Sequence, residues 1–164
     1  MVGLLGVALA FALIPRPDSG NMSPEKFNLP QNQSFLSIQG ARISSESFKN
    51  KIVIINFFTT WCPYCREEIE SLKAIRKEYP ENKVVILGLT VDAAESILKI
   101  KNYIRSQGIN YPVLAPDPAV FLAFGFNGGG IPVTLIYDGS GKLTKHWVGA
   151  QSVEDLQKAI AASK

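Results

Sequence analysis

The chain has 164 residues, of which 46% are hydrophobic and 19% are charged, and its formal net charge at pH 7 is +3. This length is sufficient for one domain with a substantial core, and the composition is that of a globular protein rather than a disordered one. The small net charge and the lack of any basic run in the sequence argue against a nucleic-acid partner.

The chain begins with an uninterrupted apolar run from Val2 to Ile14. The run is shorter than the ~20 residues that a helix needs to span a bilayer, and it fits the apolar region of a signal peptide better. We expect residues 1–14 to be a signal peptide or a truncated signal anchor, with a folded N-terminal element as the alternative. Residues 15–30 are rich in Pro, Ser and Asn and are predicted to be a linker, which leaves 31–164 as the folded domain.

The first half of this domain shows a hairpin, a strand and a helix. Short apolar stretches around Gly40 predict a hairpin over 35–43. A run of β-branched and aromatic residues predicts a buried central strand over 52–58. Apolar residues at helical spacing predict a helix over 63–79, which Pro80 ends.

The middle of the domain repeats the order of strand and helix. An apolar run predicts a second buried strand over 83–91. A helix is predicted over 93–107, with Ile97, Ile100 and Ile104 facing inward and Gly108 ending it. A short strand over 111–114 and a short helix over 117–124 are expected to follow.

The last part of the domain is predicted to be a hairpin followed by a helix. Strands over 132–137 and 142–148 are joined by a turn with the sequence Asp-Gly-Ser-Gly. Ser152 is the expected N-cap of the last helix, with Asp155 in a capping position. The order of elements predicts an α/β domain in which helices cover both faces of a central mixed sheet.

The chain contains two cysteines, Cys62 and Cys65, spaced as Cys-x-x-Cys. A disulfide-stabilised scaffold would need more pairs, and a structural zinc site usually has four ligands. The single histidine, His146, together with the two cysteines falls short of that number, so we expect no metal.

The position of the pair between a buried strand and a helix indicates redox chemistry. Cys62 is placed at the helix N-terminus, where unpaired N–H groups and the helix dipole favour the thiolate that disulfide exchange needs. Pro63 suits the first helical position. Cys65 follows one turn later and is expected to be less exposed. Cys62 would attack a substrate disulfide, and Cys65 would resolve the mixed disulfide.

The segment around the pair, Ile54 to Glu68, resembles the active site of the thioredoxin superfamily, and in particular the TlpA/ResA/CcmG-like branch of extracytoplasmic thiol-disulfide oxidoreductases. The resemblance extends over about residues 24–162. It includes the stretches 27–30, 88–92, 130–134 and 138–141. It implies a thioredoxin-like fold with an N-terminal hairpin and a βα insertion after Asp92.

This resemblance also implies roles for residues beyond the cysteines. Pro132 is expected to be a cis-proline that faces the pair, and Ile131 to contact the substrate chain in a strand-like way. Glu68 is expected to lie near Cys65, to raise its pKa and to carry a proton. Asn56 stands where ordinary thioredoxin has a buried aspartate, which favours the branch that uses Glu68.

Three residues around Cys62, namely Trp61, Pro63 and Tyr64, are expected to bind substrate together with Ile131 and Pro132. A core position for Trp61 and a solvated position for Glu68 are the alternatives. His146 is expected to be a surface or packing residue.

The resemblance implies a protein that reduces disulfides of exported proteins, with apocytochrome c as one candidate substrate. We expect the protein to be a monomer. A membrane thiol donor would supply the electrons, and the cysteine pair would need no cofactor. The location would be extracytoplasmic, in the periplasm or at the outer face of the membrane, with the chain anchored or secreted. A glutaredoxin-like enzyme, a general disulfide oxidant and a non-catalytic binding module remain open as alternatives.

Overall fold

The computed structural model describes residues 28–92, 95–126 and 128–163. Its centre is a five-stranded sheet in the order β5-β4-β3-β6-β7. The strands are β3 (Ile52–Phe58), β4 (Val84–Thr90), β5 (Val113–Leu114), β6 (Val133–Tyr137) and β7 (Leu143–Val148). β3 is parallel to β4 and antiparallel to β6, so the sheet is mixed, which confirms the prediction.

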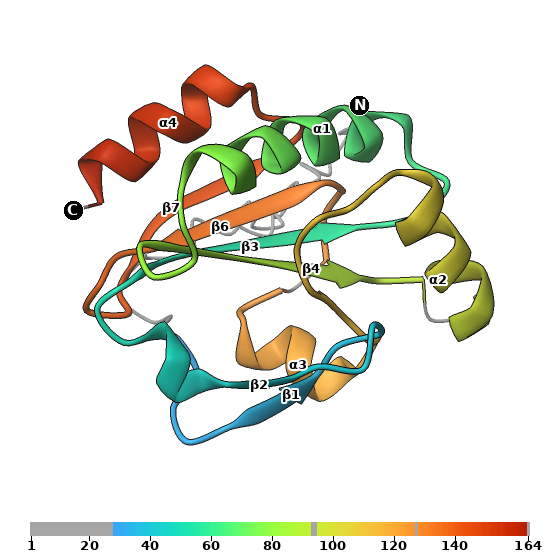
Figure 1. The fold of residues 1–164 in the computed structure, drawn as a ribbon, viewed down its shortest axis with the longest axis horizontal. Helices are drawn as coiled ribbons and strands as arrows, with labels where there is room; N and C mark the ends of the chain where they lie inside the picture. Colours follow the sequence, from blue (N-terminus) through green and yellow to red (C-terminus); the bar gives the residue numbers. More distant parts are fainter. Residues whose placement is uncertain (1–27, 93–94, 127, 164) are drawn as a thin grey trace, which may run out of the picture.

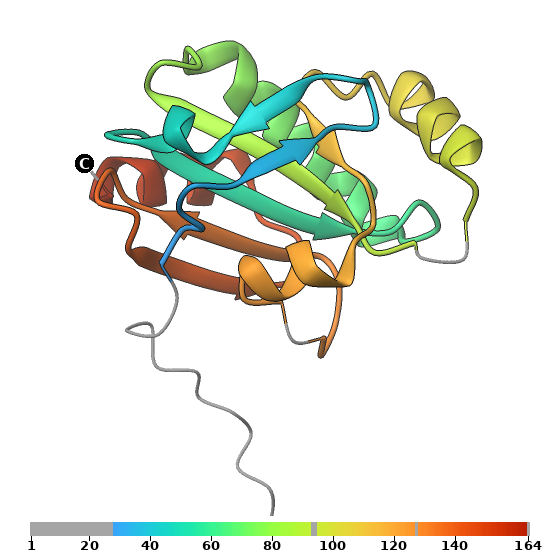
Figure 2. The ribbon, with the colours of Figure 1, turned by 90° about the horizontal axis from the view of Figure 1, so that it is seen from below.

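Helices and a small hairpin cover the two faces of this sheet (Figures 1 and 2). α1 (Pro63–Glu78) and α4 (Val153–Ala162) pack side by side on one face. The other face is covered by the hairpin of β1 (Ser34–Leu36) and β2 (Arg42–Ser44), the short helix η2 (Ser45–Phe48) and α3 (Pro118–Ala123). This is the predicted α/β architecture.

Alternation along β3 divides the core between these two faces. Val53, Ile55 and Phe57 belong to the cluster on the hairpin side, whereas Ile54 packs with residues of α1 and α4. Residues two apart on a strand point to the same face, so Asn56 shares the α1 side with Ile54. Asn56 is fully buried, which requires polar partners on that side.

The insertion helix α2 (Ile97–Ser106) starts later than the predicted helix over 93–107. Its N-cap is Ser96, whose side chain accepts a hydrogen bond from the Lys99 N–H at 3.3 Å. Residues 93 and 94 lie outside the described residues. Ile100 and Ile104 are buried as expected, but the inward position of Ile97 is wrong, since 43% of Ile97 is exposed.

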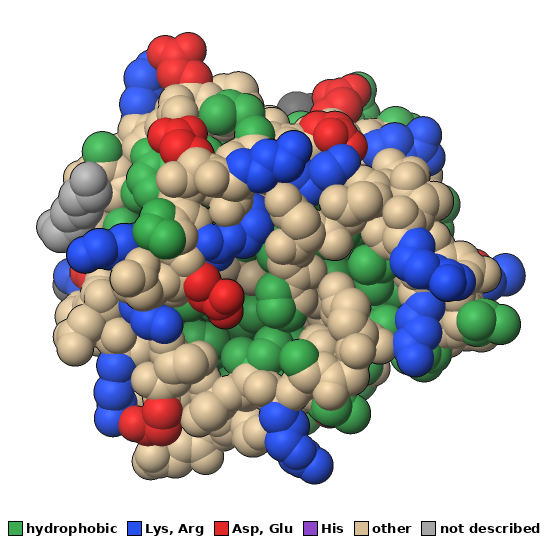
Figure 3. Space-filling view, in the orientation of Figure 1, with side chains coloured by type: hydrophobic (Ala, Val, Ile, Leu, Met, Phe, Trp, Pro, Cys, Tyr) green, Lys and Arg blue, Asp and Glu red, His purple; other side chains and the backbone are tan. Residues whose placement is uncertain are grey.

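The exposure of Ile97 follows from its place in the first turn of α2, which extends past the end of the sheet (Figure 1). Farther along, Ile100 and Ile104 join a cluster that also holds Cys62 and Cys65. The outer side of α2 carries lysine and arginine side chains, which gather there on the surface (Figure 3).

The terminal hairpin and helix form as the sequence predicts. Asp138 organises the turn between β6 and β7, because its carboxylate accepts hydrogen bonds from Ser140 N–H at 2.9 Å and Lys142 N–H at 3.1 Å. Ser152 caps α4 by accepting from the Asp155 N–H at 3.2 Å. These contacts fix the return of the chain to the α1 side of the sheet.

The predicted signal segment 1–14, and the predicted linker up to residue 27, lie outside the described residues. Within the described ranges, no helix has both the length and the apolar character needed to cross a bilayer.

Candidate active site

Cys62 stands where the chain passes from β3 into α1. It is the N-cap residue of α1, and its Sγ accepts a hydrogen bond from the Cys65 N–H at 3.2 Å. Pro63 occupies the start of the helix as predicted. A sulfur in this position accepts from a helix N–H that would otherwise be unpaired, as the side chain of an N-cap residue does.

The loop before Cys62 is held by a carboxylate from the neighbouring strand. One oxygen of Asp92 accepts hydrogen bonds from the Thr60 N–H at 2.7 Å and from the Thr90 hydroxyl at 2.8 Å. Asp92 is the second residue after β4 and is buried. The end of β4 therefore fixes the backbone from which Cys62 is presented.

Both cysteines are free thiols, and they differ in their surroundings. Cys62 keeps 4% of its surface exposed, whereas Cys65 is fully buried. Burial raises the pKa of the Cys65 thiol far above its ordinary value, and its hydrogen bond with Cys62 raises it further. The charges of Cys62 and Glu68 act in the same direction, and a backbone hydrogen bond at Thr59 opposes them.

Glu68 lies one helical turn after Cys65 and is fully buried, so it is not the solvated helix glutamate that was the alternative. Its two carboxylate oxygens have separate donors. The Asn56 amide nitrogen donates to Oε2 at 2.7 Å, and the Thr134 hydroxyl donates to Oε1 at 2.8 Å. α1, β3 and β6 thus meet at one buried carboxyl group.

Burial raises the pKa of Glu68 to about 7, against hydrogen bonds from Thr134, the Gln151 backbone and Asn56 that lower it. The desolvation of the charged form therefore outweighs three favourable contacts. A carboxyl group that titrates near neutral pH can accept a proton and return it under physiological conditions, which is what acid–base work at a thiol requires.

Large side chains stand around the cysteine pair at the surface. Trp61 is 69% exposed and Tyr64 is 64% exposed, so neither is a core aromatic. Ile131 packs against the cluster that contains both cysteines, and the Ile131–Pro132 peptide bond is cis, as predicted. Ile131 thus packs close to the cysteines, and Trp61 and Tyr64 are exposed on either side of Cys62 in the chain, whereas Pro132 is buried.

Three consecutive glycines lead into this cis bond. Gly128, Gly129 and Gly130 have φ angles of 84°, 95° and 138°, a region that side-chain-bearing residues rarely adopt. A Cβ on Gly130 would also lie 3.2 Å from the Val148 side chain. The loop before Ile131 thus depends on glycine for its path.

Sequence reasoning missed two residues of this site, Thr134 and Asp92. Thr134 enters the sequence analysis only as part of the stretch 130–134 and is given no role there. In the structure, Thr134 is paired directly with Asn56 in the β3–β6 register. A polar residue inside each of two apolar strands was the available signal, because buried polar groups need partners. His146, in contrast, lies exposed on β7 and away from the cysteine cluster.

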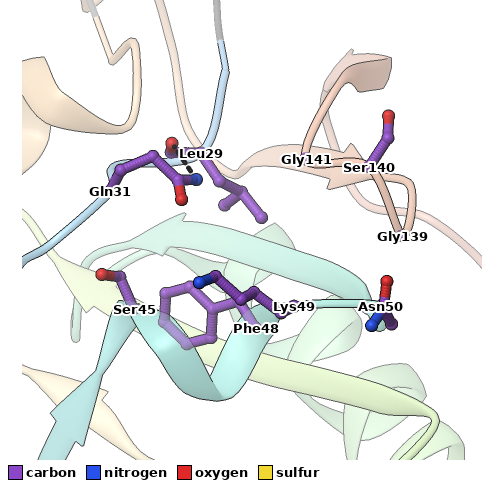
Figure 4. A pocket seen from close by; sticks show the side chains of 9 residues that line it. All are labelled: Leu29, Gln31, Ser45, Phe48, Lys49, Asn50, Gly139, Ser140 and Gly141. Carbon is purple, nitrogen blue, oxygen red and sulfur yellow. Dashed lines mark hydrogen bonds between the residues drawn. The ribbon is translucent and has the colours of Figure 1, made fainter.

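A separate cavity of about 290 Å³ lies at the far end of β3 (Figure 4). It is lined by residues of the β6–β7 turn and the segment before β3, among them Gly139, Lys49 and Asn50. Asn50 precedes the start of β3, whereas Cys62 follows its end, a separation of roughly 20 Å along a strand of this length. This cavity is therefore distinct from the cysteine site.

Replacing Glu68 with Gln should make the stability of the protein less dependent on pH. A carboxyl group whose pKa rises from about 4.5 in the unfolded chain to about 7 in the fold stabilises the protein at low pH, and this contribution is lost as pH rises through that window. The difference in unfolding free energy between the two proteins should change by about 3 kcal/mol between pH 4.5 and 8, in favour of the variant at high pH.

Urea denaturation across this pH range measures the effect. Glu67→Gln, which removes an exposed carboxylate next to it on α1, is the matched control and should follow the unmodified chain. Parallel stability curves for Glu68→Gln and the unmodified chain would contradict the buried titration of Glu68.

Comparisons with known proteins agree with this geometry. The model of the AhpC/TSA family matches residues 20–146. The thiol-disulfide oxidoreductase ResA of Bacillus thuringiensis (strain Al Hakam) is 30% identical over 120 residues, which cover 73% of this chain and 68% of that protein.

Solved structures show the same relationship. A thiol:disulfide interchange protein of the thioredoxin family from Chlorobium tepidum TLS has a TM-score of 0.74 and 33% identity, covering 83% of this chain and 96% of that one. StoA from Bacillus subtilis has a TM-score of 0.66 at 21% identity, covering 77% and 94%, and shares the fold. The thioredoxin-like fold predicted from the sequence is confirmed.

Proposed function

We propose that this chain, which belongs to the AhpC/TSA family and is a thiol-disulfide oxidoreductase, reduces disulfides of exported proteins through Cys62 and Cys65. One observation carries the proposal. A slightly exposed thiol caps α1, while the second thiol and a carboxyl group that titrates near neutral pH are buried behind it. This arrangement separates the attacking thiol from the resolving one.

The first step is attack by the Cys62 thiolate on a substrate disulfide. A bond forms between Cys62 Sγ and one substrate sulfur, the substrate S–S bond breaks, and the other substrate sulfur leaves as a thiolate that takes a proton from water. Because Cys62 keeps 4% of its surface exposed and Cys65 is fully buried, the substrate meets Cys62 first.

The second step requires Cys65 to lose its proton. Glu68, in its ionised form, accepts that proton, and the Cys65 thiolate attacks Cys62 Sγ. The Cys62–Cys65 disulfide forms, the mixed disulfide breaks, and the second substrate thiolate leaves. Two electrons pass from the cysteine pair to the substrate, and the exchange needs no cofactor beyond that pair.

The surface around Cys62 supports the docking of a protein chain. Trp61 and Tyr64 offer exposed aromatic area, and aromatic side chains provide much of the affinity of protein interfaces. Ile131, beside the cis-proline, presents backbone groups that an extended substrate segment can pair with in a strand-like way. Pro63 completes this surface next to Cys62.

An extracytoplasmic location belongs to the same proposal. The apolar run of residues 2–14 supports export or anchoring, and disulfide substrates are abundant outside the cytoplasm. A thiol donor at the membrane would return the oxidised pair to the dithiol, and apocytochrome c is one exported substrate of the required chemistry.

Two measurements test this function. The purified protein should catalyse the reduction of insulin by dithiothreitol, and Cys62→Ser should abolish that catalysis. The reduction potential of the pair should lie near roughly −270 mV, the range of a reductant, rather than near roughly −120 mV, the range of a strong oxidant. A lack of turnover in the unmodified protein would instead favour a non-catalytic binding module.

The role given to Glu68 has its own expected result. Because the charge of Glu68 raises the pKa of Cys65, Glu68→Gln should lower that pKa and move the pH dependence of turnover. Thiol titration by alkylation and mass spectrometry reports the change residue by residue. An unchanged titration of Cys65 in a folded variant would remove Glu68 from the mechanism.

A further inference from the structure

We propose that Asn56 and Thr134 are positioning residues that set the pH at which Glu68 exchanges its proton. We also propose that the side-chain amide of Asn56 rotates by a half-turn when Glu68 becomes protonated. This inference rests on the proposed function, since it concerns the group that receives the Cys65 proton.

The three side chains form a closed buried set. Asn56 and Thr134 are directly opposite each other on β3 and β6, and Glu68 reaches them from α1. The Asn56 amide nitrogen donates to Glu68 Oε2 at 2.7 Å and to the Thr134 hydroxyl at 3.2 Å, while that hydroxyl donates to Glu68 Oε1 at 2.8 Å. All three residues are fully buried.

This pattern of donors fits the ionised form of Glu68. A carboxylate is an acceptor only, and here each oxygen receives one hydrogen from a side chain. Hydrogen bonds to the charged form favour ionisation, so Asn56 and Thr134 work against the desolvation that favours the acid. Removing either donor should therefore shift the balance toward the protonated form.

The protonated form needs a different pattern. A hydroxyl on Oε2 would face the amide hydrogens of Asn56, donor against donor. The Asn56 Oδ1 atom, however, is buried and has no hydrogen-bond partner among the described residues. A half-turn of the amide places this acceptor opposite the new hydroxyl, while Thr134 continues to donate to Oε1. Asparagine can serve both states, whereas a leucine or a carboxylate cannot.

The other groups that face Glu68 do not change their charge over the pH range in which Glu68 titrates, so its titration depends on Asn56 and Thr134. Cys65 on α1 and Tyr111, which precedes β5, are the titratable groups whose interaction with Glu68 is seen. Burial raises the pKa of both, so each stays neutral while Glu68 titrates. The Gln151 backbone adds a fixed donor that does not depend on pH.

Thr134→Val tests the positioning role in the full chain. Loss of one hydrogen bond to a charged group should raise the titration midpoint of Glu68 by about one pH unit. The midpoint is read from the carboxyl ¹³C resonance that disappears in Glu68→Gln. The pH profile of insulin reduction should move in the same direction, and Thr134→Ser should restore both.

Thr59→Val is the matched control. Thr59 is also buried, but its hydroxyl has no hydrogen-bond partner within the part of the chain that the structure describes, so this change should leave the Glu68 midpoint where it is. An unmoved midpoint in Thr134→Val, or an equal movement in Thr59→Val, would overturn the positioning role. Because the unmodified protein would still turn over in that case, this failure is separate from a failure of the proposed function.

The rotation of the amide is tested in the unmodified protein. The side-chain ¹⁵N–¹H resonances of Asn56, assigned by their loss in Asn56→Ser, should shift with pH and share the midpoint of Glu68. Resonances of Asn56 that stay constant while Glu68 titrates would overturn the turning of the amide.

Discussion

Cys65→Ser should stop the reaction halfway. Cys62 can still attack a substrate disulfide, but no second thiol remains to release the product. Turnover of insulin should fall by about a thousandfold or more, while a mixed disulfide between Cys62 and the substrate accumulates. Non-reducing mass spectrometry after incubation with a disulfide-containing peptide would detect this adduct directly.

Cys62→Ser is the control that separates the two thiols. Its remaining thiol is fully buried, and burial raises the pKa of Cys65, so it should form almost no adduct. Equal trapping by the two variants would mean that either thiol can attack the substrate, and the assignment of roles would be wrong. The comparison thus tests the geometry of α1 rather than the presence of cysteine.

Phe57→Ala should cause a large loss of stability. Phe57 is fully buried on β3 and stacks on Phe126 with ring centroids 4.5 Å apart, while Phe121 of α3 meets it edge-on at 6.2 Å. Truncation removes this packing and leaves a cavity between the sheet and α3. The free energy of unfolding should fall by about 3–5 kcal/mol, as measured by urea denaturation.

Leu122→Ala provides the comparison for this change. Leu122 is on the same helix α3, but 73% of it is exposed, so its truncation should alter the free energy of unfolding by no more than about 0.5 kcal/mol. A loss below about 1 kcal/mol in Phe57→Ala would show that α3 contributes little to holding the sheet.

Local patterns were sufficient for much of the fold. The apolar run over β3 and the helical spacing after Pro63 predicted both elements, and together they placed Cys62 at a helix N-terminus. The Asp138 turn and the Ser152 cap were predicted for the same reason, since their hydrogen bonds involve residues two to four positions apart. Information of this kind is contained in a short stretch of sequence.

The remaining features depend on pairing between distant segments. Thr134 meets Asn56 only because β6 is antiparallel to β3 in one particular register, and a shift of one residue would turn it to the other face. Ile97 has the right periodicity for a buried residue, yet 43% of it is exposed, because it belongs to the first turn of α2, and that turn lies past the end of the sheet (Figure 1). A single sequence does not state where a helix stands relative to the edge of a sheet.

The inner side of α2 has a consequence for the difference between the two thiols. Ile100 and Ile104 form part of the wall around Cys65, although they lie in a helix far along the chain from it. These side chains exclude water from Cys65, and this desolvation is the largest cause of the raised pKa of the Cys65 thiol. Water entering between Cys65 and the inner side of α2 would therefore bring the pKa of Cys65 back toward its ordinary value.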